Sequence, residues 1–226
     1  MKNSTERRKQ ADPQFLERSA LERCVVQRTQ GGFSIVELLV VLIIAGILAA
    51  IAIPTLVATL SNMRGLGDAH DLNDEIGLVK MRAAANFTLA RLYVDLSAQT
   101  FHLEYWEKPD ATCTTGCWVT EGGSQNLSSG ITFGFAGLSS PPLNTQTAIG
   151  QAPACLQNDM TSQIVNTACI VFNSRGIPID STQSPTAEDA LYVTDGKSLV
   201  FGVTVSATGV IQTWQSGINS ANWTKH

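Results

Sequence analysis

The sequence is poor in the residues that most enzymes use for acid–base and metal chemistry. It contains only three histidines, His70, His102 and His226, and no pattern places one of them beside a nucleophile. The GxSxG, Walker A and HExxH motifs do not occur. We therefore expect that the chain is not an enzyme and needs no cofactor.

Charged residues are also scarce and unevenly distributed. They make up 15% of the chain against 44% hydrophobic residues, and the 15 Lys and Arg are outnumbered by 19 Asp and Glu. This balance excludes a disordered chain and a basic nucleic-acid scaffold. Residues 1–32 carry seven basic and four acidic side chains, a net charge of +3, which leaves −7 for residues 33–226.

The longest uncharged run lies between Glu37 and Arg64. It has 26 residues, and residues 38–53 are apolar apart from Gly46. As a helix the run is roughly 39 Å long, enough for a hydrocarbon core of about 30 Å. Seven Lys and Arg precede it, whereas residues 61–80 hold only two. The positive-inside rule then predicts a single-pass protein with a cytoplasmic N-terminus and an extracytoplasmic C-terminal part.

A secretory signal or an uncleaved signal anchor is the alternative for such a start. The sequence Ala50-Ile51-Ala52 could serve as a small-residue cleavage site. The basic region is, however, long and contains acids, and Glu37 lies only four residues after Phe33, where the apolar run begins. An acid on the membrane side of that boundary is costly unless it snorkels to the interface or has a specific partner.

The segment Gly31-Gly32-Phe33-Ser34-Ile35-Val36-Glu37-Leu38-Leu39-Val40-Val41-Leu42, followed by Pro54, resembles the start of type IV prepilins and type II secretion pseudopilins. The resemblance implies that residues 1–32 are a leader, which a prepilin peptidase removes between Gly32 and Phe33 before it methylates the Phe33 amine. It also implies that Glu37 pairs with the Phe33 amine of a neighbouring subunit. Independently of the family, Gly32 leaves its backbone open to a protease.

The same resemblance assigns residues 33–60 to a transmembrane and filament-core helix, in which Pro54 is expected to kink or locally melt the chain. The implied partners are the membrane, other pilin or pseudopilin subunits and an inner-membrane assembly platform. The protein would begin in the bacterial inner membrane and later enter a pilus or pseudopilus.

Residues 61–98 are predicted to form the amphipathic outer half of the helix, after a flexible patch at 61–67. Apolar residues recur there at helical spacing: Leu72, Ile76, Val79, Ala83, Phe87, Ala90 and Val94. This stripe should pack on the globular part. Four nearby acids are interpreted as a solvated helix start, not a calcium site: Asp68, Asp71, Asp74 and Glu75.

Residues 99–226 are predicted to form a β-rich head that contains a long loop at 137–168. The candidate strands are residues 101–106, 118–120, 131–136, 169–173, 191–193, 199–205 and 210–214. Asp195-Gly196 and Thr208-Gly209 favour tight turns between the last three strands. The fold class is therefore α+β, with a long N-terminal helix packed on an antiparallel, pilin-like head.

The run Cys169-Ile170-Val171-Phe172-Asn173-Ser174-Arg175-Gly176-Ile177-Pro178, with the later Gly209 turn, resembles the GspH/FimT-like minor pseudopilins. It favours a minor subunit near the filament tip over a major shaft subunit. Some FimT-like members bind DNA through arginines near the last hairpin, but residues 207–212 here contain no basic residue. Only four Lys and Arg lie between residues 93 and 226, so DNA binding is disfavoured.

Cysteine usage agrees with export. Cys24 falls in the leader, and four cysteines remain in the head, which allow three disulfide pairings. The preferred pairs are Cys113 with Cys117 and Cys155 with Cys169, the second of which would fasten the long loop to a strand. A four-cysteine zinc site is the alternative, but the spacing fits it poorly.

Overall fold

A computed structural model describes residues 32–111 and 113–226. The expected leader, residues 1–31 with Cys24, lies outside the described residues. The chain divides into two compact units, Met1–Ala49 and Ala50–His226. A single long helix, α2 (Ile35–Ala85), contributes residues to both.

Helix α2 contains neither of the two interruptions that the sequence suggested. It continues through Pro54, so the chain does not melt there, and it also continues through residues 61–67. Gly65 is buried, and a Cβ at this position would lie 2.7 Å from Cε2 of Phe201. The expected flexible patch is therefore a rigid point of close contact, where glycine lets the helix approach a strand.

The helix ends at Ala85, which corrects the prediction that it extends to residue 98. The Thr88 N–H donates to the Ala83 carbonyl at 3.2 Å and the Phe87 N–H to the Ala84 carbonyl at 3.4 Å. This pair of bonds is a Schellman motif, with Phe87 in the left-handed conformation at φ 50°. Glycine usually occupies that position, so the sequence carried no ordinary stop signal.

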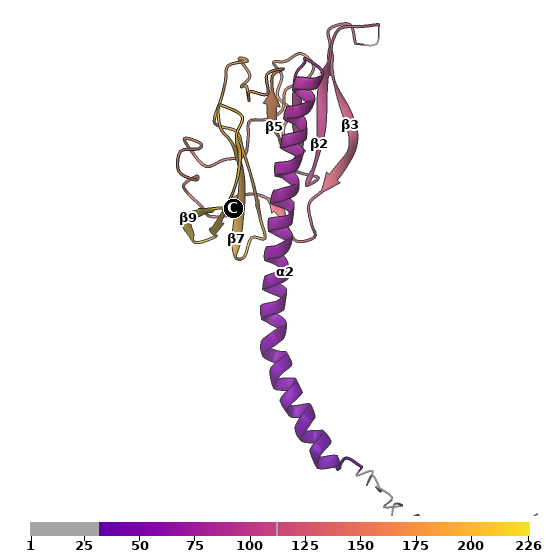
Figure 1. Ribbon diagram of the computed structural model, residues 1–226, viewed down its shortest axis with the longest axis vertical. Helices are drawn as coiled ribbons and strands as arrows, with labels where there is room; N and C mark the ends of the chain where they lie inside the picture. Colours follow the sequence, from indigo (N-terminus) through magenta and orange to yellow (C-terminus); the bar gives the residue numbers. More distant parts are fainter. Residues whose placement is uncertain (1–31, 112) are drawn as a thin grey trace, which may run out of the picture. The chain divides into compact units, whose positions relative to one another are not determined.

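Among the described residues, nine strands follow, in two antiparallel sheets (Figure 1). The first sheet has the order β3-β2-β1-β5, and its strands are β1 (Ala90–Asp95), β2 (Thr100–Glu107), β3 (Cys117–Asn126) and β5 (Thr167–Phe172). The second has the order β4-β6-β7-β8-β9, and its strands are β4 (Thr132–Phe133), β6 (Ala190–Thr194), β7 (Leu199–Val205), β8 (Ile211–Gly217) and β9 (Ser220–Lys225).

The predicted C-terminal meander is confirmed, because β6, β7 and β8 pair in chain order with antiparallel registers. Two strands were missed. Ala90 and Val94, placed on the helix by their spacing, lie on β1 at the centre of the first sheet. Strand β9 is short, polar and mostly exposed, so it has no hydrophobic alternation to reveal it.

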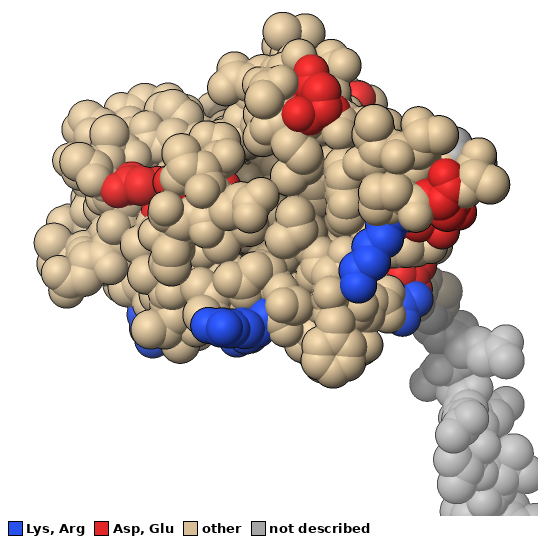
Figure 2. Space-filling view, turned by 90° about the horizontal axis from the view of Figure 1, so that it is seen from above, with Lys and Arg blue, Asp and Glu red and all other residues tan. Residues whose placement is uncertain are grey.

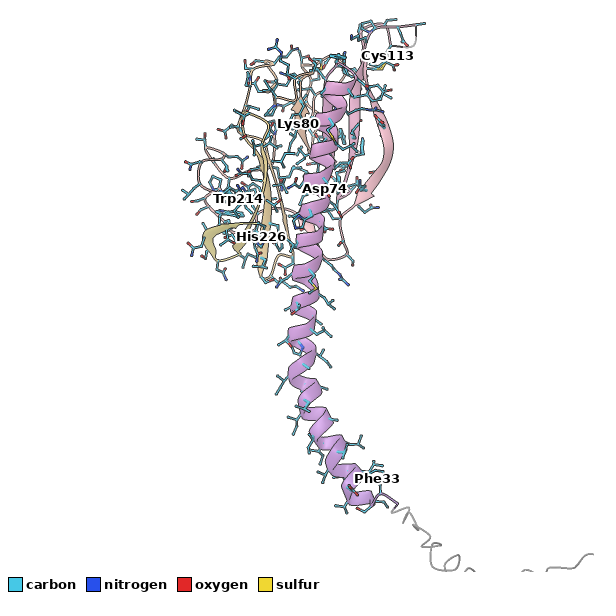
Figure 3. The ribbon with its side chains drawn as sticks, in the orientation of Figure 1. Phe33, Asp74, Lys80, Cys113, Trp214 and His226 are labelled. Atoms are coloured by element: carbon cyan, nitrogen blue, oxygen red, sulfur yellow. A yellow bond between two sulfur atoms is a disulfide. The ribbon has the colours of Figure 1, made fainter. Side chains whose placement is uncertain are left out.

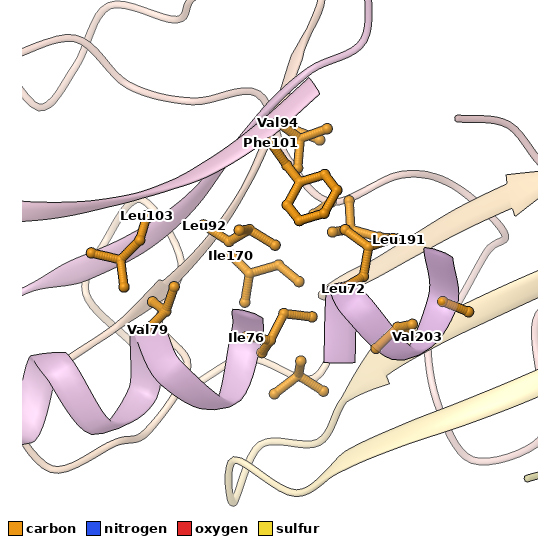
Figure 4. Packing of buried hydrophobic residues seen from close by; sticks show 14 of the residues in the cluster. Leu72, Ile76, Val79, Leu92, Val94, Phe101, Leu103, Ile170, Leu191 and Val203 are labelled. Atoms are coloured by element: carbon orange, nitrogen blue, oxygen red, sulfur yellow. The ribbon is translucent and has the colours of Figure 1, made fainter. Parts of the chain in front are cut away.

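The main core lies where α2 meets both sheets (Figure 4). The helix contributes Leu72, Ile76, Val79 and Ala83, all fully buried, which confirms the first part of the predicted stripe. Buried apolar side chains from both sheets complete the cluster, among them Leu92, Val94, Phe101, Leu103, Ile170, Leu191 and Val203. The helix thus packs along the sheets instead of standing apart from them.

The segment 137–168 is a long connection, as expected, but it is more than a surface loop. Leu138, Ala152 and Cys155 are buried, and an isolated bridge joins Leu156 to Gln163. Gln151 exchanges two hydrogen bonds with the Tyr192 backbone, at 2.8 and 2.9 Å. These contacts hold the connection against strand β6.

Candidate processing and assembly site

Gly32 and Phe33 lie in the non-helical stretch just before α2 (Figure 3). Both are exposed, Phe33 to 81%. A Cβ added to Gly32 would have no heavy atom within 4 Å. The peptide bond between them is therefore uncovered by any described part of the chain, which is the geometry that a protease needs.

Ser34 forms the N-cap of the helix, a role that sequence reasoning missed. Its Oγ accepts a hydrogen bond from the Glu37 N–H at 3.1 Å, and its carbonyl accepts the first helical bond, from the Leu38 N–H at 3.1 Å. The spacing S-x-x-E is that of a capping box, in which the acid also complements the positive end of the helix dipole. That signal was present in the sequence.

Glu37 lies in the first turn of α2 and is exposed. The N-cap therefore fixes where the helix begins and places the carboxylate one turn inside that point. Phe33 lies just before the helix and Glu37 in its first turn.

The side chains that follow are apolar, and those of residues 32–50 are all exposed. Examples are Ile35 at 86%, Leu42 at 63% and Leu48 at 63%. The helix is long and apolar enough to cross a membrane, and none of its most apolar stretch is buried. Such a surface requires a hydrocarbon environment or other apolar helices to cover it.

Pro54 lies within the continuous helix. It has no N–H to donate to the carbonyl of Ala50. Two hydroxyls nearby donate to other backbone carbonyls of the helix: Thr55 Oγ1 to that of Ala52 and Thr59 Oγ1 to that of Thr55, each at 2.9 Å. A bend at Pro54 remains a prediction.

Residues 27–53 match the prokaryotic N-terminal methylation motif. The match covers the Gly32–Phe33 bond, the Ser34 cap, Glu37 and nearly all of the apolar run up to Pro54. Its described part, residues 32–53, lies within a stretch whose residues are all exposed.

Two solved structures of the minor pseudopilin EpsH from the type 2 secretion system of Vibrio cholerae are similar to the chain at 10% identity and a TM-score of 0.40. The alignments cover 66% and 68% of this chain and 94% and 97% of those chains. No curated protein matches the chain significantly.

The four head cysteines are joined as Cys113–Cys117 and Cys155–Cys169, with Cα–Cα distances of 5.8 and 4.9 Å. This is the pairing preferred from the sequence. It leaves no free thiolate among the four for zinc. Within residues 32–111 and 113–226, no group of three His, Cys, Asp or Glu side chains is placed to hold a metal ion.

The interpretation of the four acids as a solvated helix start was wrong. All four lie well inside α2, which begins at Ile35, and Asp68 is in addition only 4% exposed. Its carboxylate accepts hydrogen bonds from the Ser128 N–H at 3.0 Å and the Ser128 hydroxyl at 2.7 Å. Burial nevertheless raises the pKa of Asp68. The acid ties the helix to the chain segment before β4.

Lys80, which sequence reasoning also passed over, lies at the point where two glycine turns meet the helix (Figure 3). Its ammonium donates to the Gly209 carbonyl at 2.8 Å. A Cβ on Gly209 would lie 2.5 Å from the Gly176 carbonyl oxygen, and one on Gly176 would lie 3.0 Å from Cε of Lys80. The two turns therefore meet each other and the helix at a point with no room for side chains.

Proposed function

We propose that the protein is a minor pilin or pseudopilin, a structural subunit of a type IV pilus or a type II secretion pseudopilus. The observation that carries the proposal is the methylation motif at residues 27–53, placed on an exposed glycine–phenylalanine bond and a capped apolar helix. The rest of the described chain, one long helix packed on antiparallel sheets, also supports the proposal, because this is the architecture expected of a pilin. We assign no catalytic step to the chain itself.

In this proposal a prepilin peptidase cuts between Gly32 and Phe33 at the cytoplasmic face of the inner membrane and methylates the new amine. Residues 33–60 then hold the subunit in the membrane, with the head outside the cytoplasm. On assembly, the Glu37 carboxylate meets the Phe33 amine of a neighbouring subunit. Pairing neutralises two charges that would each be costly in hydrocarbon. Residues 61–226 form the part that is presented at or near the filament tip.

The experiment that tests the proposal is intact mass measurement with N-terminal peptide mapping, on protein extracted from the membrane of its native host. The expected product begins at N-methylated Phe33. A chain that retains residues 1–32 would instead support an uncleaved signal-anchored envelope protein. A chain cut after Ala52 would support a secreted one.

A DNA-uptake subunit is a weaker alternative, because Lys and Arg are few after residue 60 and three of them are engaged within the chain. Lys80 is bound to a carbonyl, Arg82 is paired with Glu121, and Arg91 with Glu104. Figure 2 shows sparse charges of both signs on the face in view, among a mostly uncharged surface. DNA binding gains affinity from several neutralised phosphates. A gel-shift assay at several salt concentrations is expected to give no specific complex.

A further inference from the structure

Two buried polar atoms in the described part of the chain have no hydrogen-bond partner, Nε1 of Trp118 and Oδ2 of Asp189. Native proteins leave few such atoms unsatisfied, because each loses its water without compensation. Both residues line the same cavity, which has a volume of about 50 Å³. A donor on β3 and an acceptor just before β6, both without a partner, thus line one space.

The donor is held firmly in place. Trp118 lies on β3, and the Arg91 guanidinium from β1 stacks over its ring at 4.1 Å from the centroid. Arg91 is itself fixed, since its Nε donates to Glu104 at 2.6 Å and its Nη1 to the Leu156 carbonyl at 2.6 Å. Because Glu104 already neutralises Arg91, Arg91 does not make the cavity a binding site for an anion.

The acceptor end is acidic. Asp189 precedes β6 and is only 2% exposed. Burial, together with the charges of Asp180 and Glu188, raises the pKa of Asp189 to about 7. These two neighbours are occupied elsewhere: Asp180 accepts from the Thr182 hydroxyl at 2.7 Å, and Glu188 from the Thr147 N–H at 2.9 Å. Asp189 is the acid that lacks a donor.

The walls between these ends are mainly apolar and come from Pro153, Ala154, Met160, Val171 and Ile179. An alkyl chain fits such walls, and a terminal donor fits the acid. We propose that this cavity binds a primary alkylammonium group, which donates to Asp189, while a carbonyl next to the alkyl chain accepts from the Trp118 indole N–H. A lysine side chain of a partner polypeptide has both parts.

The test uses the full chain in detergent micelles with ¹⁵N-labelled tryptophan, so that each indole N–H gives its own signal. The probes are n-butylammonium and Nα-acetyl-lysine methylamide, and the neutral control is 1-butanol. Trp118→Phe identifies the Trp118 signal. We expect the chemical shift of the Trp118 indole N–H to change and to saturate with both amines. Blocked lysine should reach saturation at a lower concentration than n-butylammonium. In Asp189→Asn the shift should be lost, and the other indole signals should stay in place as a check of the fold.

Binding should also weaken as the pH falls from 8 to 6, because the Asp189 carboxylate takes up a proton. If the Asn variant does not fold, calorimetry on Trp118→Phe replaces it: butylammonium should still bind, and blocked lysine should lose its advantage. An unchanged Trp118 chemical shift in the presence of both amines would overturn the proposal. So would an equal shift with 1-butanol or in Asp189→Asn, which would leave only an ordered water at this site. None of these outcomes depends on whether the leader is removed.

Discussion

The apolar segment before residue 50 and the part of the chain from Ala50 onward have opposite relations to their surroundings. In the first, every described side chain is exposed and no described tertiary contact explains its identity. In the second, the helix, both sheets and the long loop bury one another. The contacts within the described chain therefore account for the residues of the second part and not for those of the first.

The largest effect is expected from a substitution of Gly32, in the exposed first segment. Gly32→Val should leave almost all of the chain with its leader attached, because a branched side chain obstructs the bond that the peptidase must reach. Gly46→Val is the matched control, since a Cβ at either glycine meets no heavy atom within 4 Å. Immunoblots of membranes from cells expressing each variant measure the ratio of precursor to mature chain. Normal processing of Gly32→Val would contradict the assigned cleavage site.

A substitution of Glu37 should impair filament assembly without affecting leader removal. Glu37→Ala is expected to be cleaved normally but to enter filaments about tenfold less or worse, because an unpaired charge in the membrane costs about 2.5–3.5 kcal/mol. Co-purification with filament subunits from cells that express the variant measures incorporation. Ser34→Ala is the control, since it weakens the same helix end without removing the charge. Equal incorporation of Glu37→Ala and the wild type would remove Glu37 from the assembly role.

In the head, Asp189 should make stability depend on pH. Its pKa is raised from 3.8 to about 7, so the folded state binds the proton more tightly than the unfolded state. The stabilisation is complete below pH 3.8 and is lost as the pH rises toward 7, by about 4 kcal/mol at 1.36 kcal/mol per unit. Urea unfolding of the wild type and Asp189→Asn across this range measures the difference. Parallel pH profiles for the two chains would show that Asp189 does not carry this dependence.

The two disulfides should contribute unequally. Cys155–Cys169 closes a loop of 14 residues and Cys113–Cys117 one of 4. The chain-entropy relation then gives about 3 kcal/mol for the first and about 2 kcal/mol for the second. Unfolding of the two double Cys→Ala variants under oxidising conditions measures each contribution. A larger loss for the short loop would argue against chain entropy as the cause.

The smallest expected effect concerns the meeting point of two turns. Gly209→Ala combines a positive φ of 77° with a contact of 2.5 Å to the Gly176 carbonyl oxygen. Gly196→Ala has a similar φ of 67° but open space. The control should cost about 1 kcal/mol from backbone strain, and Gly209→Ala about 2 kcal/mol, because the carbonyl must also move. Equal losses in thermal unfolding would mean that the turns separate freely.

The success of sequence reasoning follows the same division. The features of the first segment are local: an uncharged run, a glycine, an aromatic residue and an acid at fixed spacing are all visible in one short stretch. The meander was also predictable, since β6 to β8 are short runs rich in β-branched and aromatic residues and are joined by turns that contain Gly196 and Gly209. The predictions that failed concerned features that depend on distant residues or on an unusual residue at a helix end. The helix ends at Ala85, with Phe87 and not a glycine in the left-handed position that follows, and β1 continues the helical spacing by coincidence.

The candidate cavity could not have been predicted, because its parts are brought together only by folding. Trp118 and Asp189 are 71 positions apart in the sequence. Trp118 lies on β3 of the first sheet, and Asp189 lies just before β6 of the second. Neither forms a motif with its sequence neighbours. The contact between Lys80 and the turns at Gly176 and Gly209 could not have been predicted either, because only the folded chain brings the helix against both turns.

The contact between α2 and the sheets has a mechanical consequence. Leu72, Ile76, Val79 and Ala83 lie in a row along the helix, and Asp68 and Lys80 add polar ties on the same element. A pull along the helix axis therefore loads these contacts together in shear, not one after another as in peeling. Forced unfolding is governed by the unfolding rate. A subunit built in this way resists extraction by its helix more strongly than its equilibrium stability alone would suggest.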